Sequence, residues 1–214
     1  MRPALLFDLD GTLIDSIELI LGSARYAFAD APGHRPTDDE WRAGIGRPLQ
    51  FTIREWCDSD AEADRVLGRY REYQVENHDR LVRAYNGVVD TLHEFAAEGH
   101  PLALVTSKGG PMALRGLQLV GLADIIPVVI GCDVCANHKP HPEPVERALA
   151  LLGVDAKDAV FVGDSPHDIH SGRAAGVYTV GVSWGAFSAA DMAASGADVV
   201  IDHIADLRGV LQTF

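Results

Sequence analysis

An apolar run that ends in two aspartates, close to the start of the chain, constrains the fold more than any other feature. Residues 4–7 are all apolar, which is typical of a strand buried on both faces of a sheet. Asp8 and Asp10 follow, and they point the same way for as long as the strand persists. A bound divalent cation would offset the repulsion and lost hydration of these two charges. The spacing alone favours a simpler interpretation, in which one aspartate caps a helix and the other is solvated at a turn.

The length and the charge of the chain limit the classes of function. Its 214 residues can form one substantial core, with or without a small second domain. The 31 acidic and 18 basic residues give a net charge of −13, which argues against binding to nucleic acid or to an anionic membrane. The net negative charge does not exclude a small anionic substrate, because a local cluster of metal ion, lysine and backbone amides can outweigh the repulsion from the rest of the protein. We see no signal peptide and no membrane-spanning run, so we expect a cytoplasmic protein.

The three cysteines form an odd number, which disfavours a disulfide framework and fits a reducing compartment. Cys132 and Cys135 make one C-x-x-C motif, and His138 and His141 lie close behind it. This compact spacing fits the usual zinc patterns poorly. We therefore interpret the pair as two incidental thiols in a loop, with a zinc or redox role as the less favoured alternative.

The residues after the two aspartates are predicted to be almost entirely helical. Apolar residues recur at helical spacing over residues 17–28 and 61–78, and a shorter helix is expected over residues 38–43. No strand is expected in residues 15–80. We therefore predict that residues 15–80 form a helical cap domain, inserted into a core domain made of residues 1–14 and 81–214.

From residue 85 onward, segments typical of buried strands alternate with segments typical of helices. The strands are predicted near residues 101–106, 128–130, 159–162, 177–182 and 199–201. This alternation indicates an α/β fold with a Rossmann-like parallel sheet and helices on both faces. Ligands bind such sheets at the carboxyl ends of the strands. Polar residues at those ends are therefore the candidate functional residues.

Three further motifs lie at or near the predicted strand ends. Thr106 and Ser107 end one strand, Lys139 lies in the sequence Lys-Pro-His-Pro, and Asp164 and Asp168 lie in Gly-Asp-Ser-Pro-His-Asp. Taken singly, the threonine fits a helix cap and the lysine fits a solvated turn. A lysine at a phosphate site would reduce the repulsion between an attacking carboxylate and an anionic phosphoryl group.

The motifs together, in this order, resemble those of the haloacid dehalogenase superfamily of phosphohydrolases. The segment Phe-Asp-Leu-Asp-Gly-Thr around Asp8 resembles its first motif, and Lys-Pro-x-Pro is very similar to that of the subfamily that includes phosphoglycolate phosphatases. The resemblance implies a magnesium ion bound by Asp8, by the backbone carbonyl of Asp10 and by Asp164. Magnesium suits a shell of few carboxylates completed by water and phosphate oxygen.

The resemblance also implies a role for each residue. Asp8 is the expected nucleophile, which gives an aspartyl phosphate, and Asp10 is the expected general acid and base. Thr106 and Lys139 are expected to bind the phosphoryl group. Ser107 stands where family members often have asparagine, and we include it as a phosphate-binding candidate because backbone amides there can bind oxygen. Asp168 is expected to orient Lys139 or the site rather than to bind metal.

The helical insertion is expected to close over the catalytic edge as a lid. Its hinges are predicted near residues 15–16 and 82–85. Arg47, in a glycine-rich linker, is our candidate for a lid residue that contacts substrate, and a solvated arginine in a turn is an equal alternative.

The leading hypothesis is a magnesium-dependent phosphatase of the phosphoglycolate phosphatase type, acting on a small phosphorylated metabolite. A sugar phosphomutase or a pyrophosphatase uses the same motifs and is the alternative. A catalytically silent binding module is least favoured, because Asp8 and Lys139 are both present. The sequence carries no signal for the oligomeric state.

Overall fold

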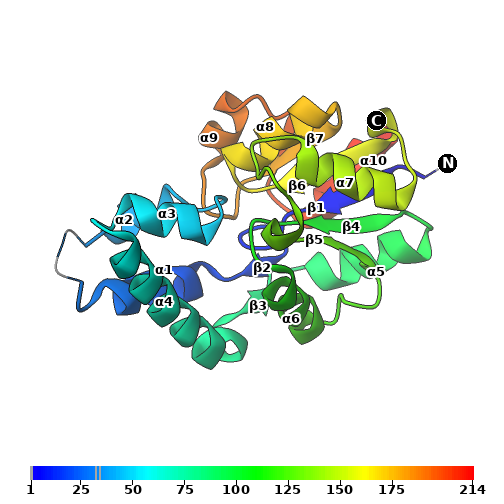
Figure 1. The fold of residues 1–214 in the computed structure, drawn as a ribbon. Helices are drawn as coiled ribbons and strands as arrows, with labels where there is room; N and C mark the ends of the chain where they lie inside the picture. The colour runs from blue at the N-terminus through cyan, green and yellow to red at the C-terminus, as the bar shows by residue number, and fades with distance from the viewer. Residues whose placement is uncertain (1, 32, 34) are drawn as a thin grey trace.

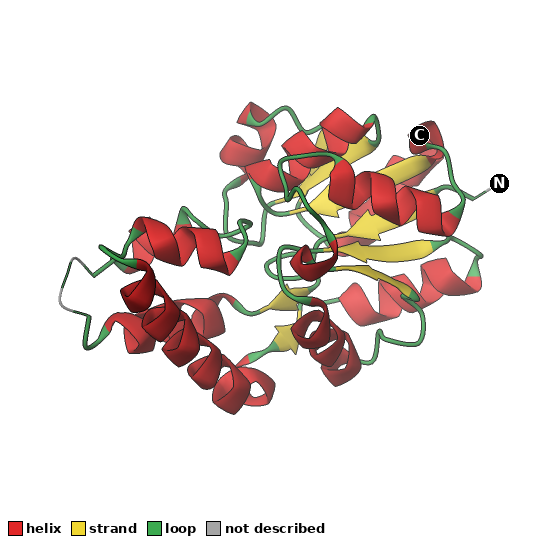
Figure 2. Cartoon of the chain, viewed as in Figure 1, coloured by secondary structure: helices red, strands yellow, loops and turns green. Residues whose placement is uncertain are grey.

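A six-stranded parallel sheet forms the centre of the computed structural model, which describes residues 2–31, 33 and 35–214 (Figures 1 and 2). Its strands are β1 (Ala4–Phe7), β4 (Leu102–Val105), β5 (Val128–Ile130), β6 (Ala159–Gly163), β7 (Tyr178–Val182) and β8 (Val199–Ile201). They lie in the order β5-β4-β1-β6-β7-β8. The first strand is central because Leu5 pairs with Leu102 on one side and with Val160 on the other.

Alternate residues of the strands face two separate hydrophobic clusters, one on each face of the sheet. Leu5 and Phe7 pack into one cluster with α5 (Val88–Ala97), α6 (Gly110–Val120) and α10 (Leu207–Thr213). Ala4 and Leu6 pack into the other cluster with α7 (Glu143–Leu152). On that face, α8 (Pro166–Ala175) packs against β6 and α7, and α9 (Ala189–Ala194) packs against α8. Both faces are therefore covered, as the continuous apolar runs predict.

Four helices of the N-terminal half form the cap, which projects from one end of the sheet (Figure 1). They are α1 (Ile17–Phe28), α2 (Asp38–Arg42), α3 (Leu49–Glu55) and α4 (Asp60–Leu81). The cap has a hydrophobic cluster of its own, in which the rings of Phe28 and Trp41 meet edge to face with centroids 5.6 Å apart. The predicted fold class, an α/β core with an inserted helical cap, is confirmed.

A two-stranded antiparallel ribbon joins the cap to the core. Ile14 and Asp15 form β2, and they pair with Ala84 and Arg83 of β3. The expectation that residue 15 lies outside any strand was therefore wrong, because strands of two residues are too short to leave a period-2 pattern. The ribbon lies where the hinge segments are predicted. Short 3₁₀ helices complete the chain at Cys132–Val134, Ala156–Asp158 and Ile204–Asp206.

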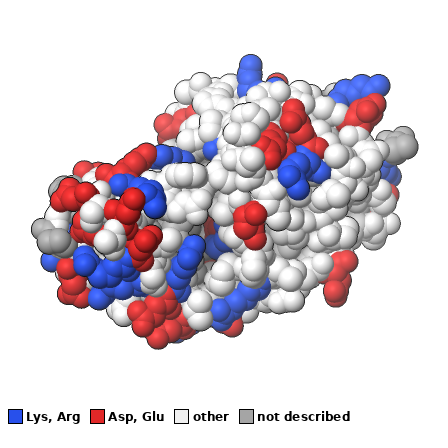
Figure 3. Space-filling view, in the orientation of Figure 1, with Lys and Arg blue, Asp and Glu red and all other residues white. Residues whose placement is uncertain are grey.

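None of the helices in the described ranges has the length and apolar character needed to cross a membrane. The surface instead carries many charges, and acidic and basic side chains of both signs gather on the cap (Figure 3). Several of these charges pair with one another, such as Arg25 with Glu18 and Asp38.

Candidate active site

The carboxyl ends of three neighbouring strands bring the predicted site residues together. Asp8 follows β1, Thr106 follows β4 and Asp164 follows β6, and each is almost fully buried. The backbone of Asp8 continues the ladder by donating its N–H to the carbonyl of Val162 at 2.9 Å. Residues 156 positions apart in the sequence, Asp8 and Asp164, thus meet at one edge because their strands are adjacent.

Three buried carboxylates form the floor of the site. Asp8, Asp164 and Asp168 each place one oxygen within 4.8 Å of the other two. Burial raises the pKa of Asp8 to about 7, although attraction by Lys139 works against the rise. Burial also raises the pKa of Asp164 well above its usual range, and repulsion by Asp8 adds to the effect. The site therefore concentrates negative charge where little water can solvate it.

Among the residues that the structure describes, Lys139 is the one whose ammonium group contacts these carboxylates. Its Nζ donates to Asp8 Oδ1 at 2.8 Å, to Asp168 Oδ1 at 2.5 Å and to the carbonyl of Val105 at 3.3 Å. Burial alone would lower the pKa of Lys139, but attraction by Asp168 and Asp8 raises it above the ordinary lysine value. The lysine is therefore charged, and it holds Asp8 in a fixed position.

The second oxygen of Asp168 belongs to the start of α8. It accepts hydrogen bonds from the N–H of Ser165 at 3.0 Å and from its hydroxyl at 2.7 Å, and the same serine caps the helix. Both oxygens of Asp168 are thus engaged by protein donors. Asp164 is engaged in a similar way, by the N–H of Ala186 at 2.7 Å and by the hydroxyl of Thr12 at 3.4 Å. The orienting role expected for Asp168 and the metal-binding role expected for Asp164 therefore stay predictions.

The donor set fits a hard divalent cation. In the described part of the chain, three buried carboxyl groups face one ammonium group, and a bound cation would favour the ionised form of the groups whose pKa burial raises. All the candidate ligands are oxygens, which hard cations prefer. The loop of Gly11 comes so close to Asp164 that a Cβ atom there would collide with the carboxylate, and its φ of +85° also requires glycine. The backbone after β1 therefore lies directly against the acidic cluster.

Asp10 forms a second carboxylate–lysine pair, at the rim of the cluster. Lys108 Nζ donates to Asp10 Oδ1 at 2.6 Å and to Oδ2 at 2.7 Å, and the hydroxyl of Ser16 donates to Oδ1 at 2.5 Å. The sequence interpretation missed Lys108. Its position two residues beyond Thr106, at the ligand edge of the sheet, was the available signal.

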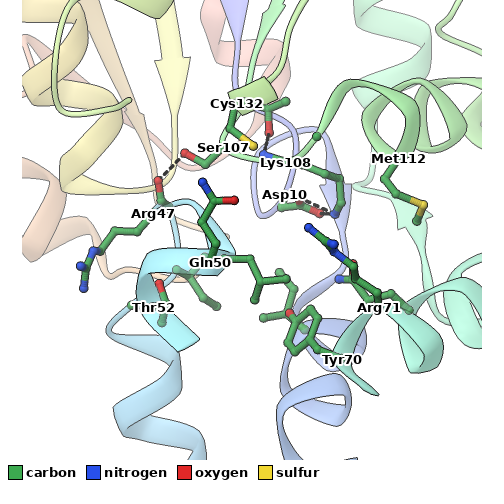
Figure 4. A pocket seen from close by; sticks show the side chains of 18 of the residues that line it. Asp10, Arg47, Gln50, Thr52, Tyr70, Arg71, Ser107, Lys108, Met112 and Cys132 are labelled. Carbon is green, nitrogen blue, oxygen red and sulfur yellow. Dashed lines mark hydrogen bonds and ion pairs between the residues drawn. The ribbon is translucent and has the colours of Figure 1, made fainter. Parts of the chain in front are cut away.

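The other two predicted residues, Ser107 and Arg47, make side-chain contacts with the cap, and both line the same cavity as Asp8. The hydroxyl of Ser107 donates to the carbonyl of Gly46 in the cap at 2.6 Å, so it joins cap to core. The guanidinium of Arg47 pairs with Glu55, and this contact lowers the pKa of the Glu55 carboxyl. Figure 4 shows the Arg47 side chain extending away from Asp10.

A cavity of about 400 Å³ lies between cap and core, above these groups. Figure 3 shows the molecule hollowed between the two parts. Core residues of the cavity wall include Asp8, Asp10, Thr106 and Lys108, and cap residues include Trp41, Gln50, Tyr70 and Arg71. Asp8 of the acidic cluster is therefore reached from a partly open cavity in which the cap forms the opposite wall.

Cys132 and Cys135 are free thiols, and burial raises the pKa of each. Within the described ranges, the three aspartates are the only group of His, Cys, Asp and Glu side chains arranged to hold a metal ion. His138 and His141 do not complete a zinc site with the two thiols.

The fold and motifs of this site recur in known proteins. A family model described as haloacid dehalogenase-like hydrolase matches residues 5–182. Pyrophosphatase PpaX of Listeria monocytogenes serotype 4b is 36% identical over 209 residues, covering 97% of this chain and 95% of that protein. Pyrophosphatase PpaX of Bacillus pumilus is 42% identical over 179 residues, covering 84% of this chain and 82% of that protein.

A solved structure has the same architecture. The crystal structure of a predicted phosphoglycolate phosphatase from Haemophilus somnus 129PT superposes with a TM-score of 0.90 at 26% identity, covering 98% of this chain and 97% of that chain. The resemblance found in the sequence is thereby confirmed. This chain belongs to the haloacid dehalogenase-like hydrolases, and within them it is a phosphohydrolase.

Proposed function

We propose that this phosphohydrolase is a magnesium-dependent pyrophosphatase, which cleaves inorganic pyrophosphate into two phosphate ions. The observation that carries the proposal is the similarity, over nearly the whole chain, to proteins named pyrophosphatases. The phosphoglycolate phosphatase hypothesis draws on a structural neighbour of lower identity. The alternative substrate class of the sequence interpretation is therefore the better supported one.

Magnesium fits the oxygen donors of the acidic cluster. Asp8 and Asp164 would hold it with their carboxylates, together with the backbone carbonyl of Asp10. When bound, the ion supplies positive charge that lowers the repulsion between substrate and carboxylates. Lys139, 2.8 Å from Asp8 Oδ1, supports the same task from the other side of the nucleophile.

The first chemical step transfers a phosphoryl group to Asp8. A carboxylate oxygen of Asp8 forms a bond to one phosphorus atom, and the bond from that phosphorus to the bridging oxygen breaks. The departing phosphate takes a proton from Asp10, while Thr106 donates its hydroxyl to the transferred group. Asp10 is suited to this role because Ser16 and Lys108 hold its carboxyl at the cavity wall.

The second step hydrolyses the aspartyl phosphate. Asp10 accepts a proton from water, the water oxygen bonds to phosphorus, and the bond from phosphorus to Asp8 breaks. Asp8 then returns to its place beside Lys139. Asp168 keeps the lysine in position through both steps, by the contact of 2.5 Å to its Nζ.

The test is phosphate release from pyrophosphate, phosphoglycolate and a sugar phosphate, each with and without magnesium. Pyrophosphate should have the highest kcat/KM, and chelation of magnesium should abolish its turnover. The Asp8→Asn variant should lose activity by a factor on the order of 10⁴ or more while it remains folded. A wild-type preference for phosphoglycolate would overturn the choice of substrate, and full activity of the Asp8→Asn variant would overturn the mechanism.

A further inference from the structure

The cap presents an arginine to the cavity that is separate from the one predicted from the sequence. Arg71 lies on α4 and lines the cavity wall. Figure 4 shows its side chain reaching from the cap toward the side where Asp10 and Lys108 lie, while Arg47 points away from them. Both arginines line the cavity, but only the side chain of Arg71 is directed toward Asp10 and Lys108.

The charge of Arg71 has no protein counter-charge. Across residues 2–31, 33 and 35–214, no carboxylate forms an ion pair with its guanidinium. Other cap arginines are engaged: Arg54 pairs with Asp60, and Arg69 pairs with Asp30. An arginine that faces a cavity without a partner keeps its planar set of donors free for an anion.

The positive charge of Arg71 also acts on a core residue across the cavity, Cys132. Burial raises the pKa of the Cys132 thiol, and the positive charge of Arg71 opposes that rise. Cys132 lies on the core wall, beyond β5. An anion in the cavity therefore meets positive charge from the cap as well as from Lys108.

The backbone of Arg71 is held firmly. Its neighbours Tyr70 and Gln74 are buried, and α4 packs along the length of α1. The helix begins at a serine cap, Ser59, whose hydroxyl accepts from the N–H of Glu62. Arg71 thus projects from a rigid helix, and only its side chain needs to adjust to a ligand. Gln50 of α3 adds an amide that Figure 4 shows directed into the same space.

We infer that Arg71 is the specificity-determining residue for the leaving group, and that it binds a second anionic group of the substrate, with Gln50 as a hydrogen-bonding partner. This inference rests on the proposed function, in which that group is the departing phosphate of pyrophosphate. The transferred phosphoryl group lies against Asp8 and Lys139, and the departing phosphate occupies the cap side of the cavity. A bidentate arginine contact suits a phosphate or carboxylate and gives nothing to an uncharged leaving group.

The experiment compares kcat/KM for pyrophosphate with kcat/KM for phenyl phosphate, whose leaving group carries no second anion. In the Arg71→Gln variant, the ratio of the two values should fall about 10- to 100-fold, mainly through a higher KM for pyrophosphate. Arg71→Lys keeps the charge without the planar donors and should restore part of the ratio. Arg65→Gln is the matched control, because Arg65 is on the same helix and pairs with Glu62 outside the cavity. It should leave the ratio as in the wild type.

The outcomes separate this inference from the proposed function. Efficient wild-type cleavage of pyrophosphate with an unchanged ratio in Arg71→Gln would overturn the inference and leave the function standing. If the wild type instead cleaves phosphoglycolate, whose leaving group is glycolate and carries a carboxylate, the same ratio is measured with that ester. A selective loss there supports Arg71 while the pyrophosphatase proposal fails. A wild type that prefers phenyl phosphate to both anionic substrates overturns the inference as well.

Discussion

The sheet edge and the cap wall enclose the same cavity, but they are built in opposite ways. On the sheet edge, the side chains of Asp8 and Lys139 are only 5% and 1% exposed, and they bond to each other. On the cap wall, Arg71 is exposed and, within the described chain, has no ion-pair partner, while Arg47 pairs with its cap neighbour Glu55. The charged side chains of the sheet edge are therefore held in place before substrate arrives. On the cap wall, the guanidinium of Arg71 is left free to bind substrate.

The difference separates two tasks. A buried network of charges is expensive to disturb, because removal of one member leaves the others unpaired in a medium of low dielectric constant. An exposed arginine is replaced at little cost to stability. Chemistry is therefore assigned to the sheet edge, where substitutions also threaten the fold. The proposed selection of the leaving group by Arg71 lies on the cap, where a substitution of this exposed residue should change selectivity more than stability.

The largest effect is expected from Lys139→Met, which disrupts the fixed wall. The change leaves Asp8 and Asp168 buried beside each other without their shared cation, so the free energy of unfolding should fall by about 3–5 kcal/mol. The kcat should fall by a factor on the order of 10³, because the ammonium no longer offsets the charge of nucleophile and phosphoryl group. Denaturant unfolding and phosphate release measure the two effects.

Lys157→Met is the control for that change, since Lys157 is exposed on a short 3₁₀ helix before the start of β6, at the opposite end of that strand from Asp164. It should behave as the wild type in both measurements. A Lys139→Met protein of normal stability would contradict the view that the sheet edge is a buried charge network.

Asp164→Asn tests the metal site on the same wall. Magnesium at about 100 times its dissociation constant should stabilise the wild type by about 2.7 kcal/mol, because it binds only the folded state. For a chain of this length, about 2–4 °C of melting temperature corresponds to each kcal/mol. The Asn variant should lose most of this magnesium-dependent shift in calorimetry. Asp158→Asn, an exposed control, should keep the shift, and an Asp164→Asn protein that keeps it too would remove Asp164 from the ligand set.

The sheet edge could be predicted from the sequence because its information is local. Each predicted site residue there stands directly after an apolar run or inside a dense motif, as Asp8 and Asp164 do. The cap wall carries no such local signal. Ser107 meets Gly46 of the cap at a separation of 61 residues. Within the core, Lys108 meets Asp10 at a separation of 98 residues, because β1 and β4 are neighbours in the sheet. The Ser107 contact depends on how the cap docks, which no spacing or periodicity encodes, and the substrate contact expected of Arg47 stays a prediction.

Lys108→Met should have an intermediate effect, because its pair with Asp10 lies between the two walls. The side chains of Lys108 and Asp10 are 8% and 14% exposed, and Ser16 still donates to Asp10 after the change. We expect kcat/KM to fall about 10- to 100-fold and the free energy of unfolding to fall by about 1 kcal/mol. If Lys108→Met destabilises the protein as strongly as Lys139→Met, the two lysines belong to one buried network and the contrast between the walls is weaker than described.

The smallest effect is expected from Ser107→Ala, which removes a single hydrogen bond between the walls. The hydroxyl of Ser107 donates to the carbonyl of Gly46 at 2.6 Å, and Gly46, with a φ of +96°, lies so close to Ser165 that a Cβ atom there would meet its hydroxyl. A neutral hydrogen bond contributes about 0.5–1.5 kcal/mol, so KM for pyrophosphate should rise about 2- to 10-fold as the cap closes less firmly. The kcat should change less, because Ser107 touches none of the charged groups. Steady-state kinetics at several magnesium concentrations separates the two effects. A loss confined to kcat would mean that Ser107 contacts the transferred phosphoryl group, as predicted from the sequence. Ser107 would then belong with the catalytic residues of the sheet edge.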